Sequence, residues 1–163
     1  MRVLGIDPGT RITGYGVVEK NGSNLIHICD GRILCTPKKS LKDRLKLIFD
    51  SLREIIDTYR PMIMAIEEGF MAKGIITSAI RLGQARGVAI LSAAYMSIDV
   101  VEYSPSEVKQ AVTGYGRADK TQVQKMVKRI LSLSYLPEQD ASDALAVSIC
   151  HLHSMKMKSY SGR

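Results

Sequence analysis

Two acidic residues stand at the ends of apolar segments, where chemistry explains them better than solvation does. Asp7 ends the apolar run of residues 2–6, and Glu67 ends a second apolar run over residues 62–66. Both runs are typical of buried β-strands, and strand ends in an α/β sheet open onto a crevice. If the two strands are neighbours, the two carboxylates meet at one edge of the sheet.

Asp140 and Asp143 form a second acidic pair. Their i, i+3 spacing puts them on one helix face, in the first turns after Pro137, where the helix dipole favours negative charge. The residues that follow are mostly apolar or small, which indicates that this end of the helix faces the core.

Four converging carboxylates repel one another unless a counter-charge is present. Mg²⁺ prefers oxygen ligands, and two Mg²⁺ ions in such a site clamp the attacking water and the leaving oxygen of a phosphodiester. We therefore expect a phosphoryl-transfer site with two Mg²⁺ ions, for which Mn²⁺ is a substitute. Two simpler interpretations stay open: Asp7 accepts backbone N–H bonds in a turn, and Asp140 only complements the helix dipole.

The elements that position these acids begin with β-structure. Apolar or alternating segments predict strands over residues 2–6, 13–18 and 25–34. Asn21-Gly22 is a strong hairpin signal between the last two. Three antiparallel strands are therefore expected in the first third of the chain.

Helices and strands alternate in the remainder. Apolar residues at helical spacing predict a helix that begins after Ser40 and ends before Pro61. A strand over 62–66, a helix over 78–96 and a strand over 98–101 follow. Three helices then begin at the caps Ser104 and Asp119 and near Pro137, the last running to about Met155. This order predicts an α/β fold with a mixed five-stranded sheet, three antiparallel strands and then parallel ones, flanked by helices.

Length and composition indicate a globular protein. A chain of 163 residues is expected to form a single domain, here residues 1–155, followed by a short basic flexible tail at 156–163. No run of about 18 apolar residues is present, so we expect no membrane span. An acid as early as residue 7 argues against a signal peptide, and three cysteines without CxxC spacing are read as reduced thiols. We therefore expect a cytoplasmic protein.

The charge balance favours a polyanionic partner. Lys and Arg number 23 against 16 Asp and Glu, which gives a net charge of +7. Nucleic acid is the first candidate partner and an acidic membrane surface the second, although a merely basic protein has the same balance. Two stretches concentrate this charge, and we favour DNA-phosphate contacts over solvated helix faces for both. They comprise Lys73, Arg81 and Arg86, and then Arg117, Lys120, Lys125, Lys128 and Arg129.

The predicted helix over 78–96 is rich in small residues, including Gly83 and Gly87. A glycine inside a helix costs up to about 1 kcal/mol relative to alanine, so close backbone approach should compensate. Either packing on the sheet or a two-fold dimer interface would supply that approach.

Five ordered sequence blocks resemble the RuvC family of bacterial Holliday-junction resolvases. The blocks are Gly5-Ile6-Asp7-Pro8-Gly9-Thr10-Arg11 with Thr13-Gly14-Tyr15-Gly16; Ala65-Ile66-Glu67 with Phe70-Met71-Ala72-Lys73; Leu82-Gly83-Gln84-Ala85-Arg86-Gly87; Val108-Lys109-Gln110 through Lys120-Thr121-Gln122-Val123; and Asp140-Ala141-Ser142-Asp143-Ala144-Leu145-Ala146. The resemblance covers residues 2 to 153. It implies an RNase H-like fold and a homodimer that makes paired, symmetric cuts in four-way DNA junctions, leaving 5′-phosphate and 3′-hydroxyl ends in recombination and repair. It also implies the RuvA–RuvB branch-migration complex as a partner.

The resemblance also assigns residues. It implies that Asp7, Glu67, Asp140 and Asp143 are catalytic acids that bind Mg²⁺, and that Lys120 acts catalytically near the scissile phosphate. The expected DNA-binding residues are Phe70, which would stack on junction bases, and Lys73, Arg81, Lys109, Arg117 and Lys120.

Two other functions compete. A one-lobe relative of actin-like ATPases would share the Asp-x-Gly-Thr loop, but that architecture needs two lobes and gives no role to Asp140 and Asp143. A non-catalytic junction-binding module would use the basic face alone. Carboxylates that face DNA repel phosphate unless a metal intervenes, which argues against this second alternative.

Overall fold

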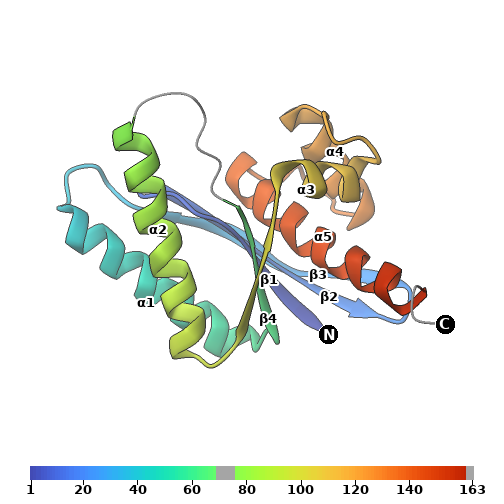
Figure 1. The fold of residues 1–163 in the computed structure, drawn as a ribbon, viewed down its shortest axis with the longest axis horizontal. Helices are drawn as coiled ribbons and strands as arrows, with labels where there is room; N and C mark the ends of the chain where they lie inside the picture. The colour runs from blue at the N-terminus through green and yellow to red at the C-terminus, as the bar shows by residue number, and fades with distance from the viewer. Residues whose placement is uncertain (69–75, 161–163) are drawn as a thin grey trace.

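The computed structural model describes residues 1–68 and 76–160, with side chains described through Met155. Its centre is a five-stranded sheet in the order β3-β2-β1-β4-β5 (Figure 1). The strands are β1 (Arg2–Asp7), β2 (Ile12–Asn21), β3 (Asn24–Leu34), β4 (Ile63–Glu67) and β5 (Asp99–Tyr103). The first three are antiparallel, whereas β4 and β5 run parallel to β1. The predicted mixed sheet is therefore confirmed.

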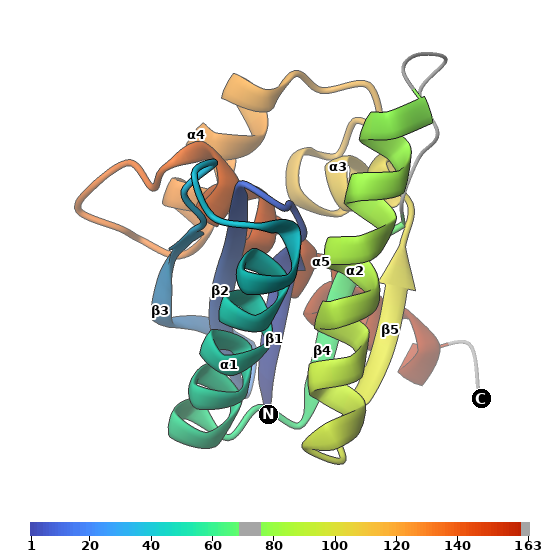
Figure 2. The same cartoon turned by 90° about the vertical axis from the view of Figure 1, so that its left-hand side faces the viewer.

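Helices cover both faces of the sheet. They are α1 (Leu41–Tyr59), α2 (Ile76–Tyr95), α3 (Pro105–Thr113), α4 (Lys120–Ile130) and α5 (Gln139–Tyr160). Figures 1 and 2 show α1 and α2 on one face of the sheet and α3, α4 and α5 on the other. Two separate hydrophobic cores follow from this layering, one on each face.

Strand alternation decides which side chains reach which core. On β1, Leu4 and Ile6 belong to the core under α1 and α2, whereas Val3 belongs to the core under α5. Because side chains alternate along a strand, Asp7 falls on the same face as Val3. On β4, Ala65 lies in the α5 core, so Glu67, two residues later, takes that face as well.

Two glycines let α5 lie directly on this face of the sheet. A β-carbon on Gly5 would overlap the backbone carbonyl oxygen of Ala144, and one on Gly14 would overlap that of Asp140. Because the first turns of α5 approach β1 and β2 so closely, Asp140 and Asp143 on this helix lie near the end of β1.

The caps predicted for the helices are present. Ser40 accepts a hydrogen bond from the backbone N–H of Asp43 at the start of α1. Ser104 with Glu107 and Asp119 with Gln122 form capping boxes at α3 and α4. The second box fixes Lys120 as the first residue of α4.

The last helix extends beyond the predicted boundary at residue 155. Its backbone is helical through Tyr160, while residues 161–163 lie outside the described residues. The flexible character of residues 156–163 therefore stays a prediction. Cys29, Cys35 and Cys150 are free thiols, as expected. Within the described residues, no helix is long and apolar enough to cross a membrane.

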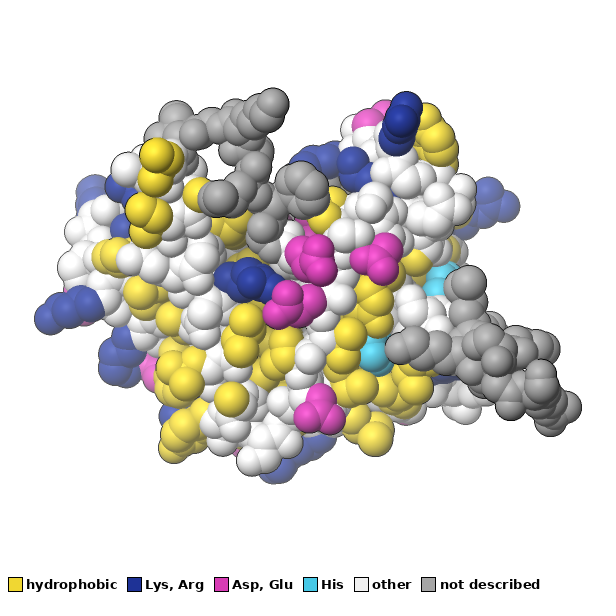
Figure 3. Space-filling view, viewed as in Figure 1, with side chains coloured by type: hydrophobic (Ala, Val, Ile, Leu, Met, Phe, Trp, Pro, Cys, Tyr) yellow, Lys and Arg dark blue, Asp and Glu magenta, His cyan; other side chains and the backbone are white. Residues whose placement is uncertain are grey.

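The small residues of α2 divide into two sets. Ala85, Ala89 and Ala93 are buried against the sheet, whereas a β-carbon on Gly83 or Gly87 would meet nothing within 4 Å. Figure 3 shows apolar side chains over the α2 side of the molecule. The exposed large ones on this helix are Ile76, Ile80, Leu91 and Tyr95. Packing on the sheet thus explains the alanines but not the two glycines.

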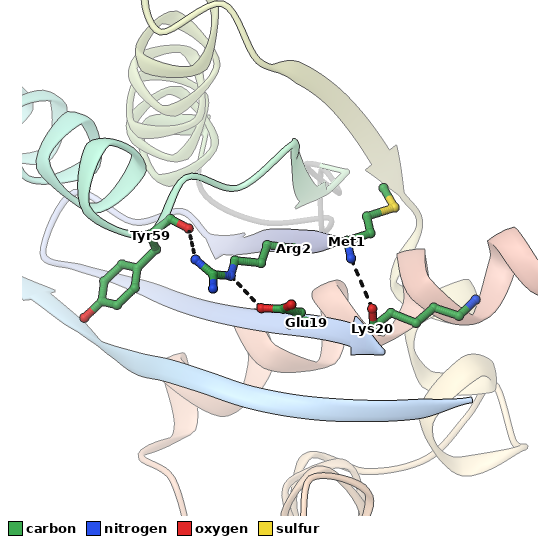
Figure 4. A network of polar contacts seen from close by, with 5 residues as sticks. All are labelled: Met1, Arg2, Glu19, Lys20 and Tyr59. Carbon is green, nitrogen blue, oxygen red and sulfur yellow. Dashed lines mark hydrogen bonds and ion pairs between the residues drawn. The ribbon is translucent and has the colours of Figure 1, made fainter. Parts of the chain in front are cut away.

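A polar network closes the end of the sheet opposite Asp7 (Figure 4). Arg2 donates to a Glu19 carboxylate oxygen at 2.6 Å and to the backbone carbonyl of Tyr59 at 2.9 Å. The N-terminal amine of Met1 donates to the Lys20 carbonyl at 3.1 Å. These bonds hold the end of α1 against β1 and β2, and the hydrogen bond from Arg2 lowers the pKa of Glu19.

Candidate active site

The parallel pairing of β1 and β4 brings Asp7 and Glu67 together. Ile6 lies opposite Ile66 in the register, so the next residue on each strand is an acid at the same edge of the sheet. The expectation that these strands are neighbours is confirmed. Their parallel direction explains why two acids far apart in sequence share one site.

Helix α5 adds a third carboxylate. Asp143 lines a cavity of about 200 Å³ together with Asp7 and Glu67. Two lysines complete its polar lining, Lys109 from α3 and Lys120 from α4. Two strands and three helices therefore supply three acids and two bases to a single pocket.

Asp140 occupies a different position. It lies one helical turn before Asp143 and lines a neighbouring groove with Gly9 and Thr10, not the cavity of the other three acids. It is still close enough for its charge to raise the pKa of Asp7, although it is the weakest of the contributions. The four predicted acids thus form a group of three with the fourth beside it.

Two carboxylates of the cavity, those of Asp7 and Glu67, have raised pKa values. The pKa of Asp7 is raised to about 7, first by burial and then by the charges of Asp143 and Glu67. Burial, followed by repulsion from Asp143, also raises the pKa of Glu67. A cation bound beside these carboxylates would favour their ionised form and offset the raised pKa values. Carboxylates with shifted pKa values in a cleft are also typical of catalytic sites.

Lys120 is the cation nearest to Asp143. Its Nζ lies 3.1 Å from Asp143 Oδ2, and the lysine side chain is 72% exposed while that of Asp143 is 17% exposed. Burial is the largest single influence and opposes its charge, but the carboxylates of Asp143, Asp7 and Glu67 together outweigh it, so the pKa of Lys120 is raised. Lys120 in turn lowers the pKa values of Asp7 and Glu67, so one lysine partly offsets three acids.

Gln139 is a site residue that sequence reasoning missed. Its side-chain amide donates to Asp143 Oδ1 at 2.9 Å, so both oxygens of Asp143 are engaged. The i, i+4 spacing of Gln139 and Asp143 on a helix was the available signal. A glutamine next to an acidic motif resembles any other surface residue, so the sequence alone does not single it out.

The donor set fits a hard divalent cation. Carboxylate oxygens are the ligands that Mg²⁺ prefers, and their mutual repulsion is relieved by a positive ion. Among the described residues, no three His, Cys, Asp or Glu side chains stand close enough to hold one ion as placed. Binding of one ion by three of these carboxylates would therefore require side chains of the site to move closer together.

Three of the predicted DNA-binding residues line the cavity or the groove beside it. Lys109 and Lys120 line the cavity, Arg81 lines the groove that contains Asp140, and Arg117 is exposed between α3 and α4. Phe70 and Lys73 lie outside the described residues. Glu68, which directly follows Glu67, is exposed and is absent from the lining of the cavity.

Comparisons with known proteins agree on one family. A family model described as crossover junction endodeoxyribonuclease RuvC matches residues 3–151. A protein of that name from Trichlorobacter lovleyi is 49% identical over 162 residues, which is 99% of this chain and 90% of that protein. One from Syntrophotalea carbinolica is 54% identical over 153 residues, or 94% of each chain.

Solved structures agree with these matches. A structure of Thermus thermophilus RuvC in complex with a Holliday junction substrate superposes with a TM-score of 0.91 and 32% identity, over 98% of this chain and 97% of that one. The yeast mitochondrial Holliday junction resolvase Ydc2 has a TM-score of 0.70 at 14% identity over 97% of this chain and 80% of that one, which is a likeness of fold alone. The RNase H-like fold expected from the sequence is therefore confirmed.

Proposed function

Because the chain belongs to the RuvC family of crossover junction endodeoxyribonucleases, we propose that it resolves four-way DNA junctions at the cavity of Asp7, Glu67 and Asp143. Like its family, it is a nuclease that hydrolyses phosphodiester bonds. Paired, symmetric cuts would release two duplexes from one junction. Neither the actin-like ATPase nor the non-catalytic module finds support among the relatives.

The proposed reaction breaks one bond in each of two strands. A water oxygen attacks the scissile phosphorus and gives up one proton, the bond from phosphorus to the 3′ oxygen breaks, and that oxygen takes up one proton. The products are a 5′-phosphate and a 3′-hydroxyl, which a ligase can rejoin.

Nucleases of this family depend on metal, and the acids are the candidate ligands. Asp7, Glu67 and Asp143 would hold the ions from one side and Asp140 from the neighbouring turn of α5. When bound, the metal supplies charge stabilisation to the attacking and leaving oxygens. We propose two Mg²⁺ ions for each site, with Mn²⁺ as a substitute.

The lysines of the cavity have a separate task. Lys120 and Lys109 lie on the side of the cavity formed by α3 and α4, where a phosphate would enter between them and the acids. Once the acids hold a cation, Lys120 Nζ is free to donate to a phosphate oxygen as negative charge develops there. Arg117, Arg81, Lys73 and Phe70 are proposed to contact the DNA outside the cavity.

One observation carries the catalytic part of this proposal. Three carboxylates from β1, β4 and α5 line one cavity, and the pKa of one of them, Asp7, is raised to about 7. A module that only bound DNA would have no use for acids that repel phosphate and destabilise their own surroundings. A nuclease needs them to hold its metal.

The direct test is cleavage of a synthetic four-way junction by the purified protein, with Mg²⁺ and with EDTA. Linear duplex of the same sequence and the Asp7→Asn protein are the controls. We expect paired nicks in the junction alone, only with metal, and junction binding without cleavage by Asp7→Asn. Binding without cleavage by the unaltered protein in every divalent metal would refute the catalytic assignment.

We propose that the protein acts as a homodimer with α2 at the interface. Exposed Ile80 and Leu91 and the open space beside Gly83 and Gly87 support this choice, because small residues permit close helix approach. Two sites related by a two-fold axis also suit a substrate that needs two symmetric cuts. Sedimentation equilibrium should give a dimer for the unaltered chain and a monomer for Leu91→Glu.

Two further proposals rest on family membership alone. One is that the RuvA–RuvB branch-migration complex delivers the junction to this protein. The other is that the protein works in the bacterial cytoplasm, where the chromosome lies. Co-purification with a tagged partner and fractionation of cells would test them.

A further inference from the structure

A second hollow lies beside the catalytic cavity. It is a surface groove of about 490 Å³ between the β1–β2 turn, the first turns of α2 and the start of α5. Its lining includes Thr10 and Arg11 from the turn, Ser78 and Arg81 from α2, and Asp140 from α5. The proposed reaction at the cavity gives no role to Arg11 or Ser78.

The turn that carries Arg11 is fixed from several sides. Thr13 Oγ1 donates to the Gly9 carbonyl at 2.8 Å, and the backbone N–H of Cys35 donates to the Arg11 carbonyl at 2.8 Å. Arg44 from α1 donates to the Thr10 carbonyl at 3.1 Å. The backbone of this turn is therefore held in place before any ligand arrives, which lowers the entropic cost of binding.

The groove is positively charged because it contains the side chains of Arg11 and Arg81. Arg11 and Arg81 are both exposed, and within residues 1–68 and 76–155 neither guanidinium forms an ion pair. Asp140 is the one acid among the described residues of the lining, so two positive charges face one negative charge. Two arginines that form no ion pair with any described residue suit an anion, and the planar guanidinium fits phosphate oxygens in pairs.

The groove and the cavity meet at the first turns of α5. Asp140 lines the groove and Asp143, one turn later, lines the cavity. Asp7 lies in the cavity, and Gly9, two residues on, lines the groove. A single DNA strand that passes its scissile phosphate through the cavity would therefore continue along the groove.

We propose that this groove is a phosphate-binding subsite, in which Arg11 and Arg81 hold the backbone of the cleaved strand next to the scissile phosphate. The inference rests on the proposed function, since it takes the cavity as the place of cleavage. Arg11 and Arg81 are binding residues that fix the position of the strand. Their contacts go to phosphate, so they carry no sequence preference.

The experiment measures binding separately from cleavage. Junction affinity is determined by fluorescence anisotropy in EDTA at several salt concentrations, for Arg11→Ala, Arg81→Ala and the double variant. Each lost phosphate contact should reduce the slope of log K against log salt by about 1, and should weaken binding about fivefold to tenfold near 0.1 M salt. Lys20→Ala is the matched control, because it removes one positive charge at the opposite end of the sheet.

Two further variants sharpen the test. Arg11→Lys keeps the charge but not the paired geometry, so it should recover the salt slope but only part of the affinity. Asp140→Asn removes the one acid of the groove lining and should tighten binding in EDTA. Arg11 and Arg81 are exposed, so the melting temperatures of their alanine variants should match that of the unaltered protein.

The outcomes separate this inference from the function on which it rests. If the unaltered protein cleaves junctions and both alanine variants keep its affinity and salt slope, the groove does not bind DNA and the inference is wrong. If the unaltered protein fails to cleave, the proposed function fails first. A loss of slope as large in Lys20→Ala as in Arg11→Ala would also overturn the subsite, because the effect would then be one of net charge.

Discussion

Gly14 on β2 lies directly beneath the backbone carbonyl of Asp140 on α5, so closely that any side chain at position 14 would overlap that oxygen. The contact joins the antiparallel half of the sheet to the helix that carries two of the proposed catalytic acids. It explains in physical terms why a glycine stands inside a long strand, where it would otherwise weaken the structure. Together with the equally close approach of Gly5 to the Ala144 carbonyl, this contact determines how near α5 lies to the sheet.

We expect Gly14→Ala to lower stability and activity together. The added methyl group must push α5 away from the sheet, and such overpacking costs about 1–3 kcal/mol of unfolding free energy or more. Urea unfolding and junction cleavage measure the two effects. Gly116→Ala is the matched control, since a β-carbon there would meet its neighbours only at ordinary van der Waals distances, with the Ser106 carbonyl oxygen at 3.5 Å. Equal stability of the two variants would contradict the role given to Gly14.

The raised pKa of Asp7 predicts that this residue destabilises the metal-free protein at high pH. Its folded pKa of about 7 exceeds its ordinary value of 3.8, so the folded state binds the proton more tightly than the unfolded state does. The contribution of the Asp7 proton to the free energy of unfolding is therefore complete below about pH 4. It is lost as the pH rises through 7, because the folded protein then releases that proton. Asp7→Asn cannot ionise. It should be more stable than the unaltered protein at pH 8 in EDTA, by about 1–3 kcal/mol, and equally stable near pH 4.

Calorimetric melting across this pH range would measure that difference. Asp57→Asn is the control, because Asp57 is exposed on α1 and its ion pair with Arg60 lies at the surface. A stability gain at pH 8 that is the same for both variants would mean that burial and crowding at Asp7 are not its source.

The same pKa predicts that protons compete with metal. Below pH 7, Asp7 must lose its proton before it can act as a ligand, so metal affinity should fall about tenfold for each pH unit on that side. Above pH 8 the affinity should level off. Titration calorimetry in two buffers of different ionisation enthalpy would detect about one proton released for each site at pH 6 and nearly none at pH 8.5. Proton release that does not change with pH would contradict the prediction.

Lys120→Ala should reduce cleavage far more than binding. The variant removes the amine expected to stabilise charge on the phosphate, a loss of about 100-fold in the single-turnover rate. Because Lys120 also lowers the pKa values of Asp7 and Glu67, the pH at which cleavage is half-maximal should move upward. Lys125→Ala removes an exposed lysine from the same helix and should change neither quantity. A Lys120→Ala protein with unaltered rate and pH profile would exclude this role.

The sequence pattern was sufficient for the strands and for the edge at which they end. Apolar runs that each finish in an acid predicted β1 and β4, and the parallel pairing of these strands makes Asp7 and Glu67 neighbours. The sequence pattern did not predict that Asp140 and Asp143 lie in different hollows. Their i, i+3 spacing predicts a shared face, but the sharp approach of α5 to β1 and β2 leaves the first in a groove and the second in a cavity.

Other parts of the site depend on distances that no local pattern encodes. The role of Gly14 needs the knowledge that α5 crosses β2, and that crossing is a long-range property of the fold. Arg11 resembles any basic turn residue until α2 brings Arg81 to the same groove. Gln139 acquires a partner only because the helix begins early enough to place it one turn before Asp143.

The acids of the cavity come from the first strand, the fourth strand and the last helix. This distribution along the chain matters during synthesis of the protein. A ribosome that has delivered β1 and β4 has not yet made Asp143, so a nascent or truncated chain carries an incomplete set of ligands. Such long-range assembly delays the site until the whole domain has folded. A nascent or truncated chain that ends before Asp143 is therefore expected to lack junction cleavage.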